Sequence, residues 1–307
     1  GPVISVIGWR MIFVVQAPLL VGAAALAWYL LPQTTRMKNV KFDVKGSVAL
    51  GIGATLFLLA VNRGHSWGWT SPPILFFAVI SIVSLWLFIR FERAAEAPLM
   101  PLKWLRTPNI ILPIAIQALL NFAYMGGFIV VPQMLEIGLG YSASHVGWLI
   151  IARPLAFSIT APLASFFTMR AGERKSGVIG ACGVIASMLI LSSMASGSSD
   201  LLVVLGLGLS GIGFGIAAPA LTALVSNAVD DETIGVAGAM QQLLSQMGAV
   251  LGSTVMISVH EMTVGSTTVV RSYGIALLFG AGTATAAALL ASRLTPTDRS
   301  AEAMAAN

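Results

Sequence analysis

Charged residues are scarce in this chain, and their scarcity is the first constraint on its class. Of the 307 residues, 9% are Asp, Glu, Lys or Arg and 57% are hydrophobic, whereas roughly 25% of a soluble domain is charged. So few charges leave too little polar surface to cover a globule in water, which predicts a chain embedded in a membrane. The formal net charge of +5 does not indicate a nucleic-acid partner, because the basic residues fall in short loops between apolar runs.

Cysteine and histidine are scarce as well. Cys182 is the single cysteine, so an intrachain disulfide is excluded, and its apolar neighbours predict a small buried side chain. His65, His145 and His260 are far apart and lack the spacing of metal ligands. The glycine-rich run 206–215 lies within an apolar helix and does not follow a strand, so it does not indicate phosphate binding. We therefore predict no enzyme, no metal site and no cofactor.

Long apolar runs make up most of the chain. A helix needs about 20 apolar residues to cross a bilayer, and nine runs approach or exceed that length: Met11–Leu31, Gly46–Val61, Pro72–Ile89, Asn109–Met134, Val146–Thr168, Gly177–Ala195, Leu201–Val225, Gly235–Val259 and Ser272–Ser292. The period-2 alternation typical of membrane strands is lacking. The pattern predicts an all-α, polytopic transmembrane bundle of about nine spanning helices.

The loops between these runs alternate in basic charge. One set of loops holds thirteen basic residues: Arg36, Lys38, Lys41, Lys45, Arg90, Arg93, Lys103, Arg106, Arg170, Arg174, Lys175, Arg293 and Arg299. The other set holds three: Arg10, Arg63 and Arg271. Because basic residues are enriched in cytoplasmic loops, this split predicts a multi-pass protein of the cell membrane with a cytoplasmic C-terminus.

Glycine recurs at helical spacing in two of the predicted helices. Gly211 and Gly215 are four residues apart, and so are Gly248 and Gly252. Small residues at this spacing allow two helix backbones to approach closely within a membrane. We predict that these four residues pack helices together in the bundle.

Polar side chains at membrane depth form the candidate site. One group shares a helix face through its i, i+4, i+7 spacing: Gln117, Asn121 and Tyr124. A second group lies on a later helix: Gln242, Ser245 and Gln246. An amide exposed to hydrocarbon is costly, so both groups should face the bundle interior or a wet cavity. Two interpretations stay open, namely hydrogen bonds between helices, at about 0.6 kcal/mol each, and the lining of a substrate cavity.

Arg153 is a charge within an apolar run. It lies about seven residues from the outer end of its predicted helix, which is roughly 10 Å deep at about 1.5 Å per residue. A charge inside the membrane costs at least about 2.5 kcal/mol, so Arg153 must snorkel to the interface, pair with an acid or face water. Glu136, near the outer end of the preceding helix, is the nearest candidate acid in sequence. An ion pair between the two residues and a role in gating or coupling are the competing hypotheses.

Several stretches follow one another in an order that is more specific than any one of them. They are Gly1-Pro2, WRMIF at 9–13 with an Ala-Pro pair at 17–18, KFDVKGSVALGIGATLFLLAVNRG at 41–64, FERAAEAPLMPLKWLRTPN at 91–109, and VPQMLEIGLGYSASHVGWLIIARP at 131–154. Together they resemble the fourteen-helix drug:proton antiporter branch of the major facilitator superfamily. The resemblance covers essentially the whole chain.

This resemblance implies a division of the chain into segments. Residues 1–31 would be the end of an N-terminal bundle, with the tail of one helix and one full helix. Residues 32–108 would be two additional helices and an inner linker, 109–293 a C-terminal six-helix bundle, and 294–307 a cytoplasmic tail. The first four helices of the family and most of the fifth have no counterpart here, so we expect the chain to be a piece of a longer protein.

The resemblance also implies a function. Family members are alternating-access carriers, so we expect part of a secondary active transporter that exports small amphipathic compounds or drugs, driven by protons. Its partners would be the lipid bilayer, a small-molecule substrate, protons and the missing N-terminal helices, and not nucleic acid. The alternative is a truncated or structural membrane fragment that inserts but transports nothing.

Overall fold

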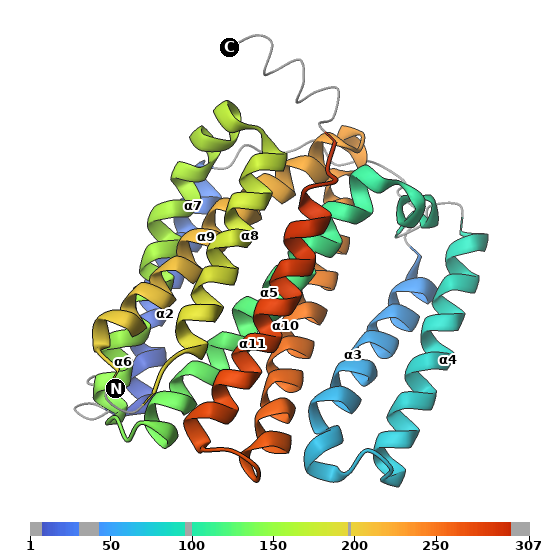
Figure 1. Cartoon of the computed structure of the whole chain (residues 1–307). Coiled ribbons are helices and arrows are strands. Elements are labelled where there is room, and N and C mark those ends of the chain that lie inside the picture. The colour runs from blue at the N-terminus through green and yellow to red at the C-terminus, as the bar shows by residue number, and fades with distance from the viewer. Residues whose placement is uncertain (1–7, 31–42, 96–99, 196–197, 296–307) are drawn as a thin grey trace.

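The computed structural model describes residues 8–30, 43–95, 100–195 and 198–295 (Figure 1). The Gly1-Pro2 opening, the basic residues Arg36, Lys38 and Lys41, and the predicted tail from residue 296 onward lie outside the described residues. Within the described ranges the chain is helical and contains no strand.

The described α-helices are α2 (Trp9–Leu30), α3 (Val44–Trp67), α4 (Pro72–Ala94), α5 (Pro108–Gln133), α6 (Ala143–Ile150), α7 (Ala152–Ala171), α8 (Glu173–Ser192), α9 (Asp200–Asn227), α10 (Ile234–Val264) and α11 (Val269–Ala291). Three short turns separate some of them: η1 (Leu102–Arg106), the π-helical η2 (Met134–Gly138) and η3 (Asp231–Thr233). Nine stretches of these residues are long and apolar enough to cross a membrane, with α6 and part of α7 forming one of them. The predicted all-α bundle of about nine spanning helices is confirmed.

Local chemistry explains where several helices begin. Asp43 is the N-cap of α3, and its Oδ1 accepts a hydrogen bond of 2.9 Å from the backbone N–H of Gly46. Proline opens α4 at Pro72 and α5 at Pro108, positions where a backbone N–H would have no partner within the helix. These starts separate the apolar runs into distinct helices.

The helices run between two ends of the bundle. The turns at 68–71, 139–142 and 265–268, which belong to the loops poor in basic residues, lie together at the bottom of Figure 1. We name this the outer end, after the orientation that the sequence predicts. The start of α5 and the turn at Gly172 between α7 and α8 lie at the opposite end, which we name the inner end.

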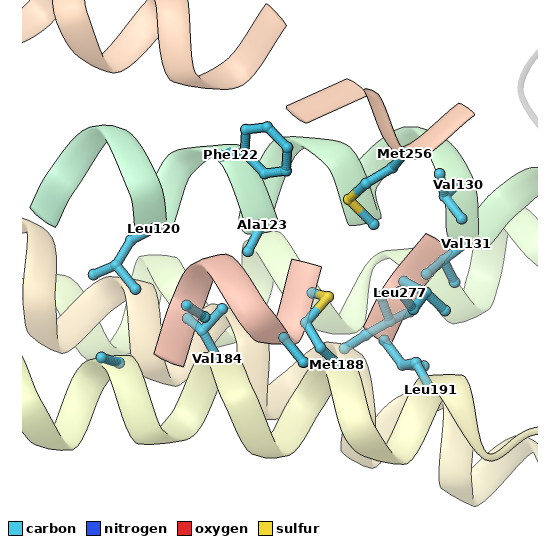
Figure 2. Close-up of a cluster of buried hydrophobic side chains, with 14 of the residues drawn as sticks. Leu120, Phe122, Ala123, Val130, Val131, Val184, Met188, Leu191, Met256 and Leu277 are labelled. Carbon is cyan, nitrogen blue, oxygen red and sulfur yellow. The ribbon is translucent and has the colours of Figure 1, made fainter. Parts of the chain in front are cut away.

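The main core lies between α5, α8, α10 and α11. Leu120 and Ala123 of α5, Val184 and Met188 of α8, and Leu277 of α11 are completely buried, and Figure 2 shows them in the space between these helices. In the apolar stretch of α5 that is long enough to cross a membrane, 61% of the residues are buried, so α5 is the central helix. Because lipid tails are as apolar as these side chains, close packing is what holds the helices together.

Glycines bring α10 directly onto α5. A Cβ placed on Gly248 would lie 2.2 Å from the carbonyl oxygen of Ala118, and one on Gly252 would lie 2.1 Å from that of Phe122. Both contacts are with backbone, which cannot rotate out of the way. Any side chain at either position would therefore force the two helices apart.

The second glycine pair faces α7 from α9. A Cβ on Gly211 would lie 2.3 Å from the carbonyl oxygen of Arg153, whereas one on Gly215 would meet the Cβ of Thr160 at 3.1 Å. The approach is therefore tightest beside Arg153. The break between α6 and α7 lies at Ile151, close to Pro154, which has no N–H to complete the hydrogen-bond ladder.

The pair α3–α4 stands beside the bundle and approaches it through α10 (Figure 1). The pair is held together by its own contacts: Ser81 Oγ donates a hydrogen bond of 2.8 Å to the carbonyl of Gly53, and Gly53 packs against Leu85. No described side chain of α2 is buried. These three helices therefore present most of their surface outward.

The position of Cys182 differs from the one predicted from the sequence. It is exposed, and not buried as its apolar neighbours predicted. The buried face of α8 includes Gly180, Ala181 and Val184, and the residue after Ala181 is turned about 100° away from that face. When a helix is apolar on every side, its sequence does not indicate which side faces the bundle.

Candidate functional site

The polar face of α5 lies against three other helices. Gln117 and Asn121 contact α10, while the backbone and ring of Tyr124 contact α7 and α9. Asn121 and Tyr124 are each 7% exposed, and Gln117 is half-buried. The three residues follow one another along successive turns, so they form a polar stripe through the middle of the bundle.

Asn121 joins α5 to α10 through its amide. Its Nδ2 donates to the carbonyl oxygen of Ser245 at 2.9 Å and to Ser245 Oγ at 3.0 Å. Ser245 is 4% exposed, so the contact is shielded from lipid and water. The Oδ1 of Asn121 has no hydrogen-bond partner among the described residues, which leaves one acceptor free in the interior.

Gln117 takes part in a second network, which reaches a third helix. Its Oε1 accepts a hydrogen bond of 3.1 Å from Nε2 of Gln241 in α10. The same nitrogen lies 3.2 Å from Thr222 Oγ1 in α9. Gln241 is 4% exposed and ties three helices together. The sequence analysis did not select Gln241, although its amide lies four residues before Ser245 and hence on the same face.

The second predicted group, Gln242, Ser245 and Gln246, does not stay together in the structure. Gln242 and Gln246 are exposed, whereas Ser245 is buried, so the three do not form one inward-facing cluster. The reason is helical phase: a step of one residue turns the direction of a side chain by about 100°. The two exposed glutamines are one turn apart and share a face of α10 that points away from α5.

Arg153 is the largest fully buried side chain, at 2% exposure. Its Nη2 donates to the backbone carbonyl of Tyr124 and to Ser210 Oγ, the latter at 2.8 Å. Its Nε and Nη1 have no hydrogen-bond partner among the described residues. One guanidinium from α7 thus bridges α5 and α9 with two of its nitrogens unused.

Aromatic rings supply much of the remaining surroundings of this charge. The guanidinium carbon lies 3.8 Å from the centroid of the Tyr124 ring, and that ring stacks on Phe214 of α9 at 4.4 Å. Phe128 is a second, more distant ring, at 5.9 Å. A desolvated cation over an aromatic face gains about 2 kcal/mol, which offsets part of the cost of burial.

The predicted ion pair between Arg153 and Glu136 does not form in the structure. Glu136 is exposed, in the π-helical turn η2 at the outer end of α5, whereas Arg153 is buried against the turn that contains Tyr124. The two residues differ in depth, and the arginine finds a carbonyl and a hydroxyl nearer at hand. Sequence distance pointed to the acid because carbonyl oxygens and aromatic faces cannot be located from sequence alone.

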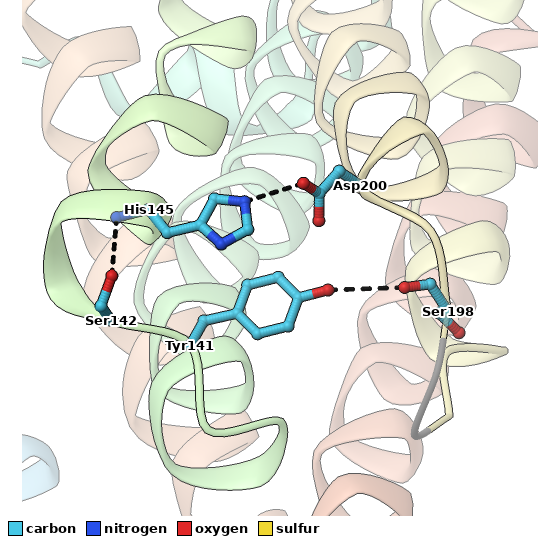
Figure 3. Close-up of polar contacts among 5 residues, drawn as sticks. All are labelled: Tyr141, Ser142, His145, Ser198 and Asp200. Atoms are coloured by element: carbon cyan, nitrogen blue, oxygen red, sulfur yellow. Dashed lines mark hydrogen bonds and ion pairs between the residues drawn. The ribbon is translucent and has the colours of Figure 1, made fainter.

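A polar cluster at the outer end joins α6 to α9 (Figure 3). His145 Nε2 lies 2.8 Å from Asp200 Oδ2, and the imidazole stacks on the ring of Tyr141 at 4.7 Å. The phenol of Tyr141 donates to the carbonyl of Ser198 at 3.4 Å, and burial, followed by closeness to Asp200, raises its pKa. This cluster fixes the short helix α6 to the start of α9.

The second described histidine side chain is also held by neighbouring groups. His260 Nδ1 lies 2.8 Å from Ser272 Oγ, and its ring stacks on Tyr273 at 3.6 Å. Within the described ranges, no three His, Cys, Asp or Glu residues gather closely enough to hold a metal ion. Both imidazoles thus take part in contacts that join neighbouring helices at the outer end.

The comparisons with known proteins agree with one another. The family model described as Major Facilitator Superfamily matches residues 1–253 and 114–306 of the chain, in two overlapping matches. Multidrug resistance protein Stp of Mycobacterium tuberculosis is 28% identical over 252 residues, which are 82% of this chain and 47% of that protein. The similarity therefore extends across most of the chain.

Two further relatives carry names that refer to resistance. Quinolone resistance protein NorB of Staphylococcus aureus is 28% identical over 290 residues, covering 92% of this chain and 61% of NorB. The tetracenomycin C resistance and export protein of Streptomyces glaucescens is 27% identical over 262 residues, covering 83% and 48% of the two chains. The chain thus spans about half to three-fifths of the length of the curated relatives that it matches.

Proposed function

The chain belongs to the Major Facilitator Superfamily, and we propose that it is part of a membrane exporter of small amphipathic compounds. Transport would be driven by protons and would proceed by alternating access, in which two bundles rock around a site near the midplane. Relatives named for multidrug resistance and for export of tetracenomycin C support this proposal. The helices that would complete the second bundle are among its expected partners.

The observation that carries the proposal is the polar stripe of α5 and its partners. Gln117, Asn121 and Tyr124 are polar side chains, yet they are buried or half-buried near the middle of a spanning helix. Their partners lie on α7, α9 and α10. Polar groups inside a membrane span mark substrate or ion pathways when they face the interior of a bundle.

We propose distinct roles for the two sides of α10. Gln241 and Ser245 hold the helix to α5, while Gln242 and Gln246 project from a neighbouring side of α10, turned by about 100°. An amide facing hydrocarbon is costly, so these exposed glutamines would face water or another helix in the complete protein. We assign them to the lining of the transport path, next to the half of the carrier that precedes this chain.

Arg153 would serve gating or coupling through its position. It links α5, α7 and α9 next to the break at Ile151, so a movement of α6 relative to α7 would shift its hydrogen bonds. Its charge does not titrate in the physiological range. In this proposal Arg153 is a fixed positive charge whose surroundings change during the cycle, and not itself a proton carrier.

Efflux by the complete gene product tests the proposal. Cells expressing it should extrude ethidium and related dyes, and an ionophore that collapses the proton gradient should stop extrusion. Gln242→Ala and Gln246→Ala should alter the ranking of substrates at normal expression, while Gln133→Ala, near the outer end of α5, should not. A protein that inserts and folds but extrudes no compound would instead support the structural-fragment alternative.

A further inference from the structure

A cavity of about 730 Å³ opens at the outer end of the bundle, between the end of α8 and the start of α11. Residues 192–195 line one side of it, and residues 268–271 with Gly274, Ile275 and Leu278 line the other. Its volume is within the range of small-ligand sites, about 300–1,000 Å³. No residue of the polar stripe lines this α8–α11 cavity, so it is separate from the candidate transport site.

Arg271 is the one charged residue that lines the α8–α11 cavity. Its side chain is exposed, and its guanidinium forms no hydrogen bond, ion pair or ring contact with a described residue. No acid lines the cavity, and the nearby Asp200, at the start of α9, is bonded to His145. The five N–H donors of the guanidinium are therefore available to a ligand that carries negative charge.

Thr268 places a second donor beside this arginine. Its Oγ1 accepts a hydrogen bond of 3.4 Å from the backbone N–H of Arg271, and its own hydroxyl hydrogen has no partner among the described residues. The hydroxyls of Ser192 and Ser193 differ, because they donate to carbonyl groups within α8. The free donors are thus concentrated on the α11 side, and the arginine fork matches the geometry of a phosphate group.

Deeper in the membrane the cavity becomes apolar. Arg271 lies two residues, Ile275 six and Leu278 nine after the first residue of α11, which places them roughly 3, 9 and 14 Å from the outer end at about 1.5 Å per residue. Leu278 is 48% exposed, and so is nearly the same fraction of Leu189, 47%, one turn before Ser193 on α8. A free anion would leave this apolar surface uncovered, whereas the acyl chains of a phospholipid would cover it.

We propose that the α8–α11 cavity binds an anionic phospholipid, whose phosphate accepts hydrogen bonds from the guanidinium of Arg271 and the hydroxyl of Thr268. The acyl chains would lie along Ile275 and Leu278. A net negative charge is selected because the lining holds one cation and no acid, so a zwitterionic head group would bring an ammonium without a counter-charge. The proposal is independent of export, because the lipid is seated outside the polar stripe.

Lipid labelling of the full-length protein tests the inference. Purified, delipidated protein would be labelled with a photoreactive phosphatidylglycerol, with unlabelled phosphatidylglycerol, phosphatidylethanolamine or inorganic phosphate as competitors, and the labelled peptides would be identified by mass spectrometry. Label should map to the end of α8 and the start of α11, and phosphatidylglycerol should compete best. Arg271→Gln should weaken that competition about tenfold, which corresponds to the loss of one hydrogen bond to a charged group. Arg271→Lys keeps the charge without the fork and should weaken it less, by about threefold.

Arg63→Gln is the matched control, since Arg63 is also an exposed arginine toward the outer end but does not line the cavity. It should leave binding unchanged. Equal competition by phosphatidylethanolamine would overturn the selection by charge, and equal competition by inorganic phosphate would overturn the assignment to a lipid. Label on other helices only, or equal losses in Arg271→Gln and Arg63→Gln, would overturn the site. The mapping needs only the wild-type protein, so it decides the location even if a variant fails to fold.

Discussion

The bundle α5–α11 and the pair α3–α4 are both built from spanning helices, yet different contacts hold them. In the apolar stretch of α5, 61% of the residues are buried, against 22% in that of α4. The bundle contains glycines packed directly against backbone and hydrogen bonds that join three helices, whereas among the described residues α3 and α4 share one buried hydrogen bond, from Ser81 to Gly53. Hydropathy alone does not distinguish the tightly packed bundle from the α3–α4 pair, because the helices of both regions are apolar enough to span a membrane.

The strongest way to test this difference is to add a side chain to a glycine in each region. Gly252→Ala should destabilise the protein by about 3 kcal/mol or more, because overpacking against backbone leaves no room to relax. Gly51→Ala in α3 should leave stability unchanged or raise it by up to about 1 kcal/mol, since nothing lies within 4 Å of its Cβ position and alanine favours a helix more than glycine does. Thermal unfolding of the purified full-length protein measures both. Equal losses would show that close helix approach is not what distinguishes the bundle.

Neutralising Arg153 should affect transport more than folding. In Arg153→Met the buried, uncompensated charge is removed, which offsets the loss of the bonds to Tyr124 and Ser210. We expect folded protein at normal levels and at least about tenfold slower efflux, equivalent to about 1.4 kcal/mol. Glu136→Gln is the control and should be nearly silent, because Glu136 is exposed and not paired with Arg153. Loss of function in both, with recovery in the double variant, would restore the ion-pair hypothesis.

Neighbouring glutamines on α10 sharpen the comparison within one helix. Gln241→Ala removes two hydrogen bonds, to Gln117 and Thr222, and should cost about 1.2 kcal/mol at about 0.6 kcal/mol each. Gln242→Ala should leave stability almost unchanged because its side chain is exposed. Thermal unfolding of the two variants decides between these roles. The reverse ranking would mean that α10 is rotated from the orientation described.

The last prediction concerns the orientation of the chain in the membrane, and its variants should disturb the protein least. Thr70→Cys and Lys175→Cys lie at exposed positions at the outer and inner ends, and Cys182→Ala provides the background because Cys182 is exposed. An impermeant thiol reagent should label intact cells at position 70 and label position 175 only after lysis. Activity should stay normal in both. The opposite labelling pattern would contradict the orientation predicted from the basic loops.

The sequence predicted the helices well because a spanning helix is determined by local composition. The nine apolar runs correspond to the nine candidate spans among the described residues, and the resemblance to the major facilitator superfamily agrees with the family match. The i, i+4, i+7 spacing of Gln117, Asn121 and Tyr124 also placed their side chains on one face of α5. These features need no knowledge of how helices pack.

The contacts between helices were harder to predict. Helix α10 carries two adjacent glutamines. Nothing in the local sequence distinguishes Gln241, which is buried, from Gln242, which is exposed. The surroundings of Arg153 come from α5 and α9, so the nearest acid in sequence was a poor guide. The prediction that Cys182 is buried was wrong for a related reason: its helix is apolar on most sides, so the sequence does not show which side is buried. In each case, tertiary packing selected the buried face.

Arg153 has a consequence for the electrical behaviour of the carrier. A permanent charge with no acidic partner in the described bundle is free to contribute to the current when the bundle moves. Transfer of one charge across the membrane is worth about 2.3 kcal/mol per 100 mV. If rocking carries the guanidinium through about a fifth of the field, 100 mV would shift the balance between the two conformations by about 0.5 kcal/mol, or roughly twofold. Membrane voltage would then bias the cycle even for an uncharged substrate, and Arg153→Met would reduce that bias.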